Sequence, residues 1–304
     1  MIRNILTIVF VFFFSLCILF SKTVLAQEGG PMEVVKVKYL NADGLVAGRT
    51  DSVYDLNLGP DGNVYVAEYR RNKVTVMDRG LNVLRSIDVT MPHGVVVDKK
   101  GFVYVATYDH GRVYKFDGEG KEVPDWDKSL KEQGHTKIPV AMDVDKDGNV
   151  YIADWGTKTI ILASSDGQFL SAFDTSKIPG GELSPHGVLT DQTKYVYVAD
   201  RSPAKCVRVF SLAGDYVTQW NIGDQVWEPL AVRFINKTQL GVPDYKSGSI
   251  HVFNLDGQAV STIGTAGRKE GEFLYPMNLI ADAEGFFYVV EQDGNRVQKF
   301  RLKK

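Results

Sequence analysis

A short motif recurs six times along the chain: an apolar residue, Tyr, an apolar residue and Ala, or a close variant. The copies begin at Val64, Val103, Val150, Val196, Leu240 and Phe287. Successive copies lie 39 to 47 residues apart, and no other feature of the sequence constrains the fold as strongly. A period of about 40–45 residues is typical of repeats that each form one small antiparallel sheet. One such sheet cannot bury both of its faces, so the repeats must stack on one another.

The second repeat illustrates the strands that each unit is expected to contain. Gly94–Val97 forms a first strand, the Lys100-Gly101 turn follows, and Val103–Ala106 forms a second strand. Arg112–Phe116 forms a third, and a more polar outer strand completes the unit. Six such units predict an all-β protein, a six-bladed β-propeller of four-stranded antiparallel blades. A solenoid is the structural alternative, but it would need polar capping repeats, and the sequence contains none.

The two ends of the repeat region indicate how the ring closes. The last copy ends at Arg296–Leu302 and lacks an outer strand, whereas Glu33–Tyr39 alternates like a strand ahead of the first complete unit. We therefore expect this N-terminal strand to complete the last blade, with residues 33–302 in one domain of six four-stranded sheets and almost no helix.

Over Gly59–Phe300 the chain resembles the NHL-repeat family. The resemblance rests on the core of the repeat, which reads Asp-Gly-Asn-Val-Tyr-Val-Ala-(Asp/Glu) in its clearest form. It implies a six-bladed propeller, but it implies little about function, because such propellers serve as enzymes, sensor domains and binding platforms.

Hairpin geometry predicts which residues meet at one end of the channel. The residue that opens the first strand and the residues that close the second lie at the same end of a blade, so three sets of six should cluster there. The innermost set is Tyr54, His93, Val140, His186, Leu230 and Met277. Fourteen residues later come Glu68, Thr107, Asp154, Asp200, Asp244 and Glu291. One residue further stand Tyr69, Tyr108, Trp155, Arg201, Tyr245 and Gln292.

The last of these sets contains four aromatic residues, which are a common means of building a binding surface. With Arg70 beside Tyr69 and Lys246 beside Tyr245, it suits a peptide, protein or glycan ligand better than a lipid. The five acids of the second set are ligand-binding candidates on the same face. Their alternative role is to bind the backbone amides of neighbouring turns.

His93 and His186 both stand in Pro-His-Gly and occupy the same position in alternate blades, where the sixth blade has Met277. Three side chains from alternate blades converge on the axis, and three ligands with one open position are the layout of a catalytic metal site. Methionine is a poor zinc ligand but suits Cu(I), so either zinc or copper is a candidate. The alternative is that the imidazoles bond to backbone carbonyls and the methionine plugs the channel.

The stretch His93–Phe116 also resembles a blade of the peptidyl-hydroxyglycine amidating lyase family. That resemblance implies a zinc site of three histidines, each preceded by proline, and His93 and His186 match two of them. Met277 replaces the third, and Trp155 stands where the family has a tyrosine that acts in catalysis. A metal-dependent lyase or hydrolase is therefore the alternative to a binding module.

The N-terminus predicts export. Arg3 precedes the largely apolar stretch Ile5–Phe20, and Val24-Leu25-Ala26 fits a signal-peptidase site, so residues 1–26 are expected to be a signal peptide and 27–304 the mature propeller. An uncleaved anchor is the alternative. However, as a helix the apolar stretch would rise only about 24 Å, less than a bilayer core of roughly 30 Å. The expected location is secreted or periplasmic, with no membrane association after cleavage.

Charge and cysteine content add two expectations. Cleavage would remove Arg3 and Lys22, leaving 33 basic and 37 acidic residues with no basic block that could track nucleic-acid phosphates. It would also remove Cys17 and leave Cys206 alone, so no internal disulfide is expected and packing must hold the domain together.

Overall fold

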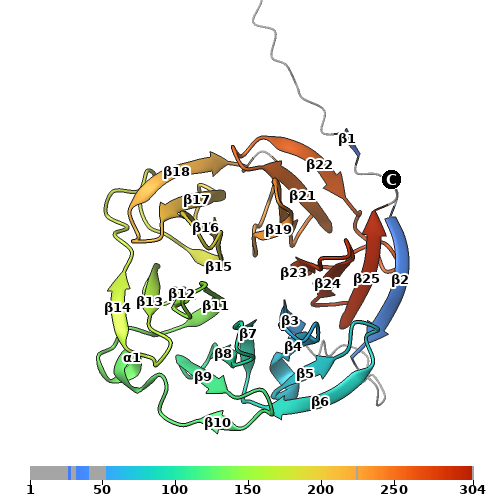
Figure 1. Cartoon of the computed structure of the whole chain (residues 1–304). Helices are drawn as coiled ribbons and strands as arrows, with labels where there is room; N and C mark the ends of the chain where they lie inside the picture. The colour runs from blue at the N-terminus through green and yellow to red at the C-terminus, as the bar shows by residue number, and fades with distance from the viewer. Residues whose placement is uncertain (1–26, 29–31, 41–52, 224, 303–304) are drawn as a thin grey trace, which may run out of the picture.

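A computed structural model of the chain consists of six antiparallel sheets arranged as a ring around a central channel (Figure 1). The structure describes residues 27–28, 32–40, 53–223 and 225–302. The expected six-bladed β-propeller is confirmed. The expected signal peptide, residues 1–26, lies outside the described residues.

The strands follow one another outward from the channel in every blade. Blade 1 contains β3 (Val53–Leu58), β4 (Val64–Glu68), β5 (Lys73–Met77) and β6 (Val83–Asp88). Blade 2 contains β7 (Pro92–Val97), β8 (Val103–Thr107), β9 (Arg112–Phe116) and β10 (Glu122–Val123). Blade 3 contains β11 (Pro139–Val144), β12 (Val150–Asp154), β13 (Thr159–Ala163) and β14 (Phe169–Ala172).

The other three blades repeat this order. Blade 4 contains β15 (Pro185–Thr190), β16 (Tyr195–Asp200), β17 (Cys206–Ser211) and β18 (Tyr216–Asn221). Blade 5 contains β19 (Arg233–Asn236), β20 (Gln239–Asp244), β21 (Ser249–Asn254) and β22 (Ala259–Ile263). Blade 6 contains β23 (Pro276–Ala281), β24 (Phe287–Glu291), β25 (Arg296–Leu302) and, as its outermost strand, β2 (Met32–Tyr39).

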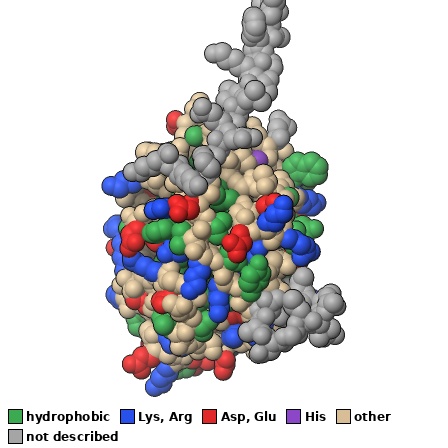
Figure 2. All heavy atoms as spheres, turned by 90° about the vertical axis from the view of Figure 1, so that its right-hand side faces the viewer, with side chains coloured by type: hydrophobic (Ala, Val, Ile, Leu, Met, Phe, Trp, Pro, Cys, Tyr) green, Lys and Arg blue, Asp and Glu red, His purple; other side chains and the backbone are tan. Residues whose placement is uncertain are grey.

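The pairing of β2 with β25 confirms the predicted closure of the ring. The two strands run antiparallel from Met32 opposite Leu302 to Tyr39 opposite Arg296, and Figure 1 shows them side by side. Basic and acidic side chains are interspersed on this side of the molecule (Figure 2). The short strand β1 (Gln27–Glu28), which we did not expect, pairs in parallel with β22 and gives blade 5 a fifth strand.

Local sequence accounts for the hairpins and for the packing between blades. Gly62, Gly101, Gly148 and Gly285 adopt φ of 79° to 88° in the turns between first and second strands, a region that favours glycine. The apolar strand residues pack across the gap between neighbouring blades. Tyr104 of blade 2 and Ile152 of blade 3, for example, belong to one buried cluster.

Helical structure is confined to two short segments among the described residues. They are the 3-10 turn η1 (Tyr69–Arg71) and the five-residue helix α1 (Lys128–Glu132). Within that part of the chain, no helix has the length and apolar character needed to span a bilayer.

Candidate functional site

A β-bulge places the innermost residue of most blades at the channel. In blade 2, Pro92 pairs with Thr107 and Gly94 pairs with Ala106, which leaves His93 between them without a partner in the ladder. Such a bulge turns the side chain of the extra residue away from its regular direction. The same shift in register occurs around Tyr54, Val140, His186 and Met277.

The glycine of Pro-His-Gly lets the next blade approach closely. A Cβ atom on Gly94 would lie 2.8 Å from the carbonyl oxygen of Val140, and one on Gly187 would lie 2.7 Å from Cα of Ala231. Both distances are shorter than van der Waals contact allows, so each glycine is required where two inner strands meet. Close packing between blades therefore accounts for the glycine of the Pro-His-Gly motif.

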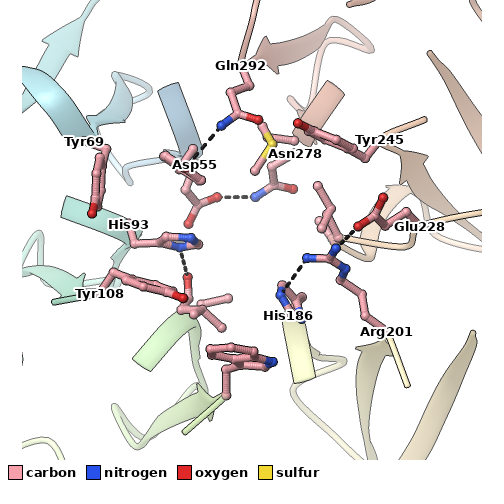
Figure 3. Close-up of a pocket in the computed structure, with 18 of the residues that line it drawn as sticks. Asp55, Tyr69, His93, Tyr108, His186, Arg201, Glu228, Tyr245, Asn278 and Gln292 are labelled. Atoms are coloured by element: carbon pink, nitrogen blue, oxygen red, sulfur yellow. Dashed lines mark hydrogen bonds and ion pairs between the residues drawn. The ribbon is translucent and has the colours of Figure 1, made fainter. Parts of the chain in front are cut away.

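The six blades enclose a cavity of about 550 Å³ where these inner residues converge (Figure 3). All six residues of the innermost set line it, and so do all six of the set that begins at Tyr69. The fold thus gathers the side chains of both sets around one space. The other lining residues are Asp55, Ala141, Gly187, Glu228, Ala231, Arg233 and Asn278.

Six aromatic rings follow one another around the part of the cavity formed by blades 1 to 4, and we call them the ring wall. In order they are Tyr69, Tyr54, His93, Tyr108, Trp155 and His186, with successive centroids 5.2, 4.4, 5.6, 6.2 and 6.3 Å apart. These separations are within the usual range for neighbouring rings in proteins. His93, Tyr108 and Trp155 lie nearly parallel, with successive planes 24° and 21° apart, whereas Tyr69 and His186 meet their neighbours at 60° and 62°. The wall therefore lines this side of the cavity with aromatic rings.

In the remaining part, polar and charged side chains lie among Leu230, Tyr245 and Met277. Nη1 of Arg201 lies 2.9 Å from Nε2 of His186, and the same guanidinium forms an ion pair with Glu228. Lys246 also lies near Glu228, 3.6 Å from its Oε2. Gln292 donates a hydrogen bond of 3.1 Å to the hydroxyl of Tyr54 (Figure 3). The charges at this edge are thus paired within the protein.

Both channel histidines are held neutral with the proton on Nδ1. Nδ1 of His93 lies 2.8 Å from the carbonyl oxygen of Val140, and Nδ1 of His186 lies 3.3 Å from that of Ser184, so each must donate. Burial lowers the pKa of His93 to about 4. Burial, and then the positive charge of Arg201, lowers the pKa of His186 to about 3. Each Nε2 is consequently a hydrogen-bond acceptor at neutral pH.

Asp55, Asn278 and Arg233 line the cavity but were not identified from the sequence. Asp55 accepts hydrogen bonds from the N–H groups of Val95 and Leu56 and from the amide of Asn278. Burial raises the pKa of Asp55, and the nearby charge of Arg233 lowers it. Their place in the repeat could have indicated two of them, because Asp55 and Asn278 each directly follow a residue of the innermost set.

The five acids placed with the aromatic set are not brought to the cavity. All are at most 1% exposed, and none is among the described residues that line it. Four of them bind the loops that precede their blades. Asp154 accepts from the N–H groups of Lys137 and Ile138, and Asp244 from those of Trp227 and Glu228. Asp200 and Glu291 each accept from one N–H group of the preceding loop. Asp200 and Glu291 also pair with buried arginines, and Glu68 accepts from Thr75. Their positions correspond to the turn-binding alternative.

Arg70, another ligand-binding candidate, lies on η1 with an exposed side chain and is not among the cavity-lining residues. Its neighbour Tyr69 does line the cavity and donates a 3.0 Å hydrogen bond to Asp109. Of these two neighbouring candidates, Tyr69 therefore lies at the cavity and Arg70 lies outside it.

The donor set of His93, His186 and Met277 does not fit a three-ligand zinc site. All three line the cavity, but Arg201 occupies Nε2 of His186, and a thioether is a poor zinc ligand. Among the described residues, no group of three histidine, cysteine, aspartate or glutamate side chains is placed to hold a metal ion. A metal would require Arg201 to move away from His186.

No protein-family model matches the chain. Among solved structures, it is similar to streptogramin B lyase, with 11% identity and a TM-score of 0.60 over 88% of this chain and 98% of that one. It is also similar to hydrazine synthase of Kuenenia stuttgartiensis, with 14% identity and a TM-score of 0.62 over 85% and 99% of the two chains. A third similar structure is a catalytically inactive variant of virginiamycin B lyase from Staphylococcus aureus with quinupristin, with 14% identity and a TM-score of 0.59 over 92% and 97%. At these identities the likeness establishes a shared propeller fold.

Proposed function

We propose that the chain is an exported binding module that takes a small ligand, or the end of a peptide or glycan chain, into the cavity at the channel. The observation that carries this proposal is the ring wall, in which six rings from four blades face one cavity of about 550 Å³. Pockets of roughly 300–1,000 Å³ with apolar walls and a few polar groups are typical small-ligand sites.

The closed ring of lining residues favours a ligand that enters end-on. All six blades contribute to the lining, so an extended chain has no groove through which both of its ends could leave. Covering a flat aromatic side chain removes a large apolar area from water, and such residues often dominate binding energy. Trp155, whose residue is 39% exposed, offers the most open surface of the ring wall.

The indole N–H signals of tryptophan provide a direct test by NMR. The chain has four tryptophans, of which Trp155 lies in the ring wall and Trp227, 63% exposed, lies outside the cavity. Trp155→Phe and Trp227→Phe assign the two signals. We then add uncharged methyl glycosides, capped aromatic amino acids and capped dipeptides to the full chain. A saturable shift of the Trp155 signal with an unchanged Trp227 signal supports the proposal. If no probe moves the Trp155 signal, the proposal fails.

A metal-dependent lyase or hydrolase in the same cavity is the second candidate function. Its support is that His93, His186 and Met277 all line one cavity. The measurement is elemental analysis of the purified full chain, followed by titration with Zn²⁺ and with Cu(I). One equivalent of metal that is lost together in His93→Gln and His186→Gln would favour this candidate, and a metal content independent of both residues would reject it.

Export and the NHL character of the repeat are further parts of the proposal. Export rests on Arg3, the apolar stretch Ile5–Phe20 and the small residues that end at Ala26. N-terminal sequencing of protein recovered outside the cytoplasm should begin at or near Gln27, and retention of Met1 in a membrane fraction would indicate an anchor. The NHL assignment rests on the repeat core over Gly59–Phe300, and a profile built from relatives of this chain would test it.

A further inference from the structure

The two Pro-His-Gly histidines are identical in sequence context but differ in what their Nε2 atoms bind. Nε2 of His186 accepts from Arg201 at 2.9 Å. For Nε2 of His93, the described part of the chain supplies no hydrogen-bond partner, although Nδ1 of the same ring is fixed by Val140. The His93 ring extends toward the centre of the cavity (Figure 3). One of the two histidines therefore presents an open acceptor.

The ring of His93 is held in this orientation from both sides. Tyr54 lies 4.4 Å from it between centroids, and Tyr108 lies 5.6 Å away with the two planes 24° apart. Turning the imidazole would break the hydrogen bond to Val140 and disturb both contacts. The acceptor is thus preorganised, which reduces the entropic cost of using it to bind a ligand.

The charges around the cavity disfavour a ligand with a net charge. Arg201 is paired with Glu228, and His93 and His186 are neutral. Arg233 is buried, and its Nη1 donates to the carbonyl oxygens of Val188 and Val232. An ion entering this site would lose its hydration without gaining an unpaired opposite charge, which is costly. An uncharged ligand avoids that cost.

The polar groups are also distributed around the circumference of the cavity. His93 lies in blade 2, Arg201 in blade 4, and Gln292 in blade 6. A single phenol or indole could reach one of them, whereas a ring with several hydroxyl groups on its rim could reach groups on different sides. Hydroxyl groups both donate and accept, which matches an open acceptor at His93 and donors at Arg201.

We infer that the ligand is an uncharged sugar ring that lies with its C–H face on the ring wall and donates a hydroxyl hydrogen bond to Nε2 of His93. This inference rests on the proposed binding function and specifies its ligand class. His93 is then the residue that selects for a donor, and Val140 positions it by fixing the proton on Nδ1. Tyr108 and Trp155 supply the flat surface next to it.

The probes for this inference are the methyl pyranosides of glucose, galactose, mannose and N-acetylglucosamine, with N-acetyltyrosinamide and N-acetyltyrosine as neutral and charged aromatic comparators. Each is titrated into the full chain while the Trp155 indole signal is followed. At least one glycoside should give saturable binding. His93→Phe, which keeps a flat ring but removes the acceptor, should weaken it about tenfold, or ~1.4 kcal/mol. His93→Gln retains an acceptor and should weaken it less.

His135→Phe is the matched control, because His135 stacks on Phe169 outside the cavity, and it should leave binding unchanged. Glycoside binding that is unaffected by His93→Phe would overturn the inference. Saturable binding of N-acetyltyrosinamide or N-acetyltyrosine with no response to any glycoside would also overturn it, while leaving the proposed binding function intact. If no probe shifts the Trp155 signal, both this inference and the proposed binding function are rejected.

Discussion

Nη1 of Arg201 lies 2.9 Å from Nε2 of His186, so the guanidinium occupies the nitrogen that a metal ion or a ligand would need. His93 stands in the same Pro-His-Gly motif, and the described residues place no such group on its Nε2. The two copies of the motif thus differ in what their Nε2 atoms contact within one channel. The difference comes from Arg201, which belongs to the set that begins at Tyr69.

Removing Arg201 should change the titration of His186. Arg201 lowers the pKa of His186, so Arg201→Gln should raise it above its present value of about 3, while burial keeps it below 6.5. The pKa of His93, which no contact links to Arg201, should stay near 4. Histidine ring signals followed by NMR from pH 7 to pH 3 measure both. An unchanged pKa of His186 would mean that the contact with Arg201 does not persist in solution.

Gly94→Ala and Gly187→Ala should each destabilise the domain by about 1–3 kcal/mol, because the added methyl group meets backbone atoms of the next blade that cannot move independently. Gly118→Ala is the control, since the nearest atom to its new Cβ would lie 3.8 Å away and its φ is not left-handed. Urea unfolding of the three variants compares their free energies. Equal stabilities for Gly94→Ala and Gly118→Ala would contradict the close packing of blades 2 and 3.

The cavity residues that could be predicted from the sequence are those at fixed positions of the repeat. Hairpin geometry fixes the separation between the residue that opens a blade and the residue that closes its second strand, so both cavity sets followed from residue numbers alone. The acids one position earlier did not reach the cavity, because adjacent side chains on an extended chain point in different directions. Asp154 faces the loop at Lys137, while Trp155 faces the cavity.

Apart from Asp55, Asn278 and Arg233, the features that were not predicted lie outside the repeat. Glu228 belongs to the loop before β19, and only the folded chain places it beside Arg201. The parallel pairing of β1 with β22 involves two residues, which is too short for any periodic pattern to reveal. β2, in contrast, has eight residues and an incomplete last blade to pair with, and its place in the ring could be predicted.

The pairing of β2 with β25, which closes the ring, should contribute to the stability of the whole domain. Removing residues 27–39 would leave β25 as an exposed edge and uncover Phe300 and Val297, which are 1% or less exposed. We expect the truncated chain to unfold at a lower temperature and to associate through the open edge. Thermal unfolding with light scattering measures both effects. A truncated chain that stays monomeric with an unchanged midpoint of thermal unfolding would show that the pairing of β2 with β25 does not stabilise the ring.

The effect of His93 on the free energy of unfolding should depend on pH. Its pKa is about 4 in the folded chain and about 6.5 when unfolded, so below pH 6.5 the unfolded chain binds a proton that the folded chain does not. The wild-type protein should therefore lose up to ~1.4 kcal/mol per pH unit, relative to His93→Gln, as the pH falls from 6.5 to 4. Asp143, whose pKa burial raises to about 6, acts in the opposite direction.

Comparing the two proteins isolates His93, because the contribution of Asp143 is present in both. Tyr54 and Tyr108 contact the ring of His93, and the charge of His93 influences His186, but all three groups are present in both proteins. Urea unfolding at half-unit pH intervals provides the measurement. A stability difference that stays constant from pH 6.5 to 4 would show that His93 is not held neutral by burial.

The central claim is that the ring wall binds the ligand, and the double variant Tyr108→Ala/Trp155→Ala tests it most directly. Loss of two hot-spot rings should cost about 2 kcal/mol or more, so saturation transfer to the bound glycoside should disappear while the circular dichroism of the sheets is unchanged. Trp227→Ala removes an exposed indole outside the cavity and should retain the full signal. Undiminished saturation transfer in the folded double variant would contradict the account.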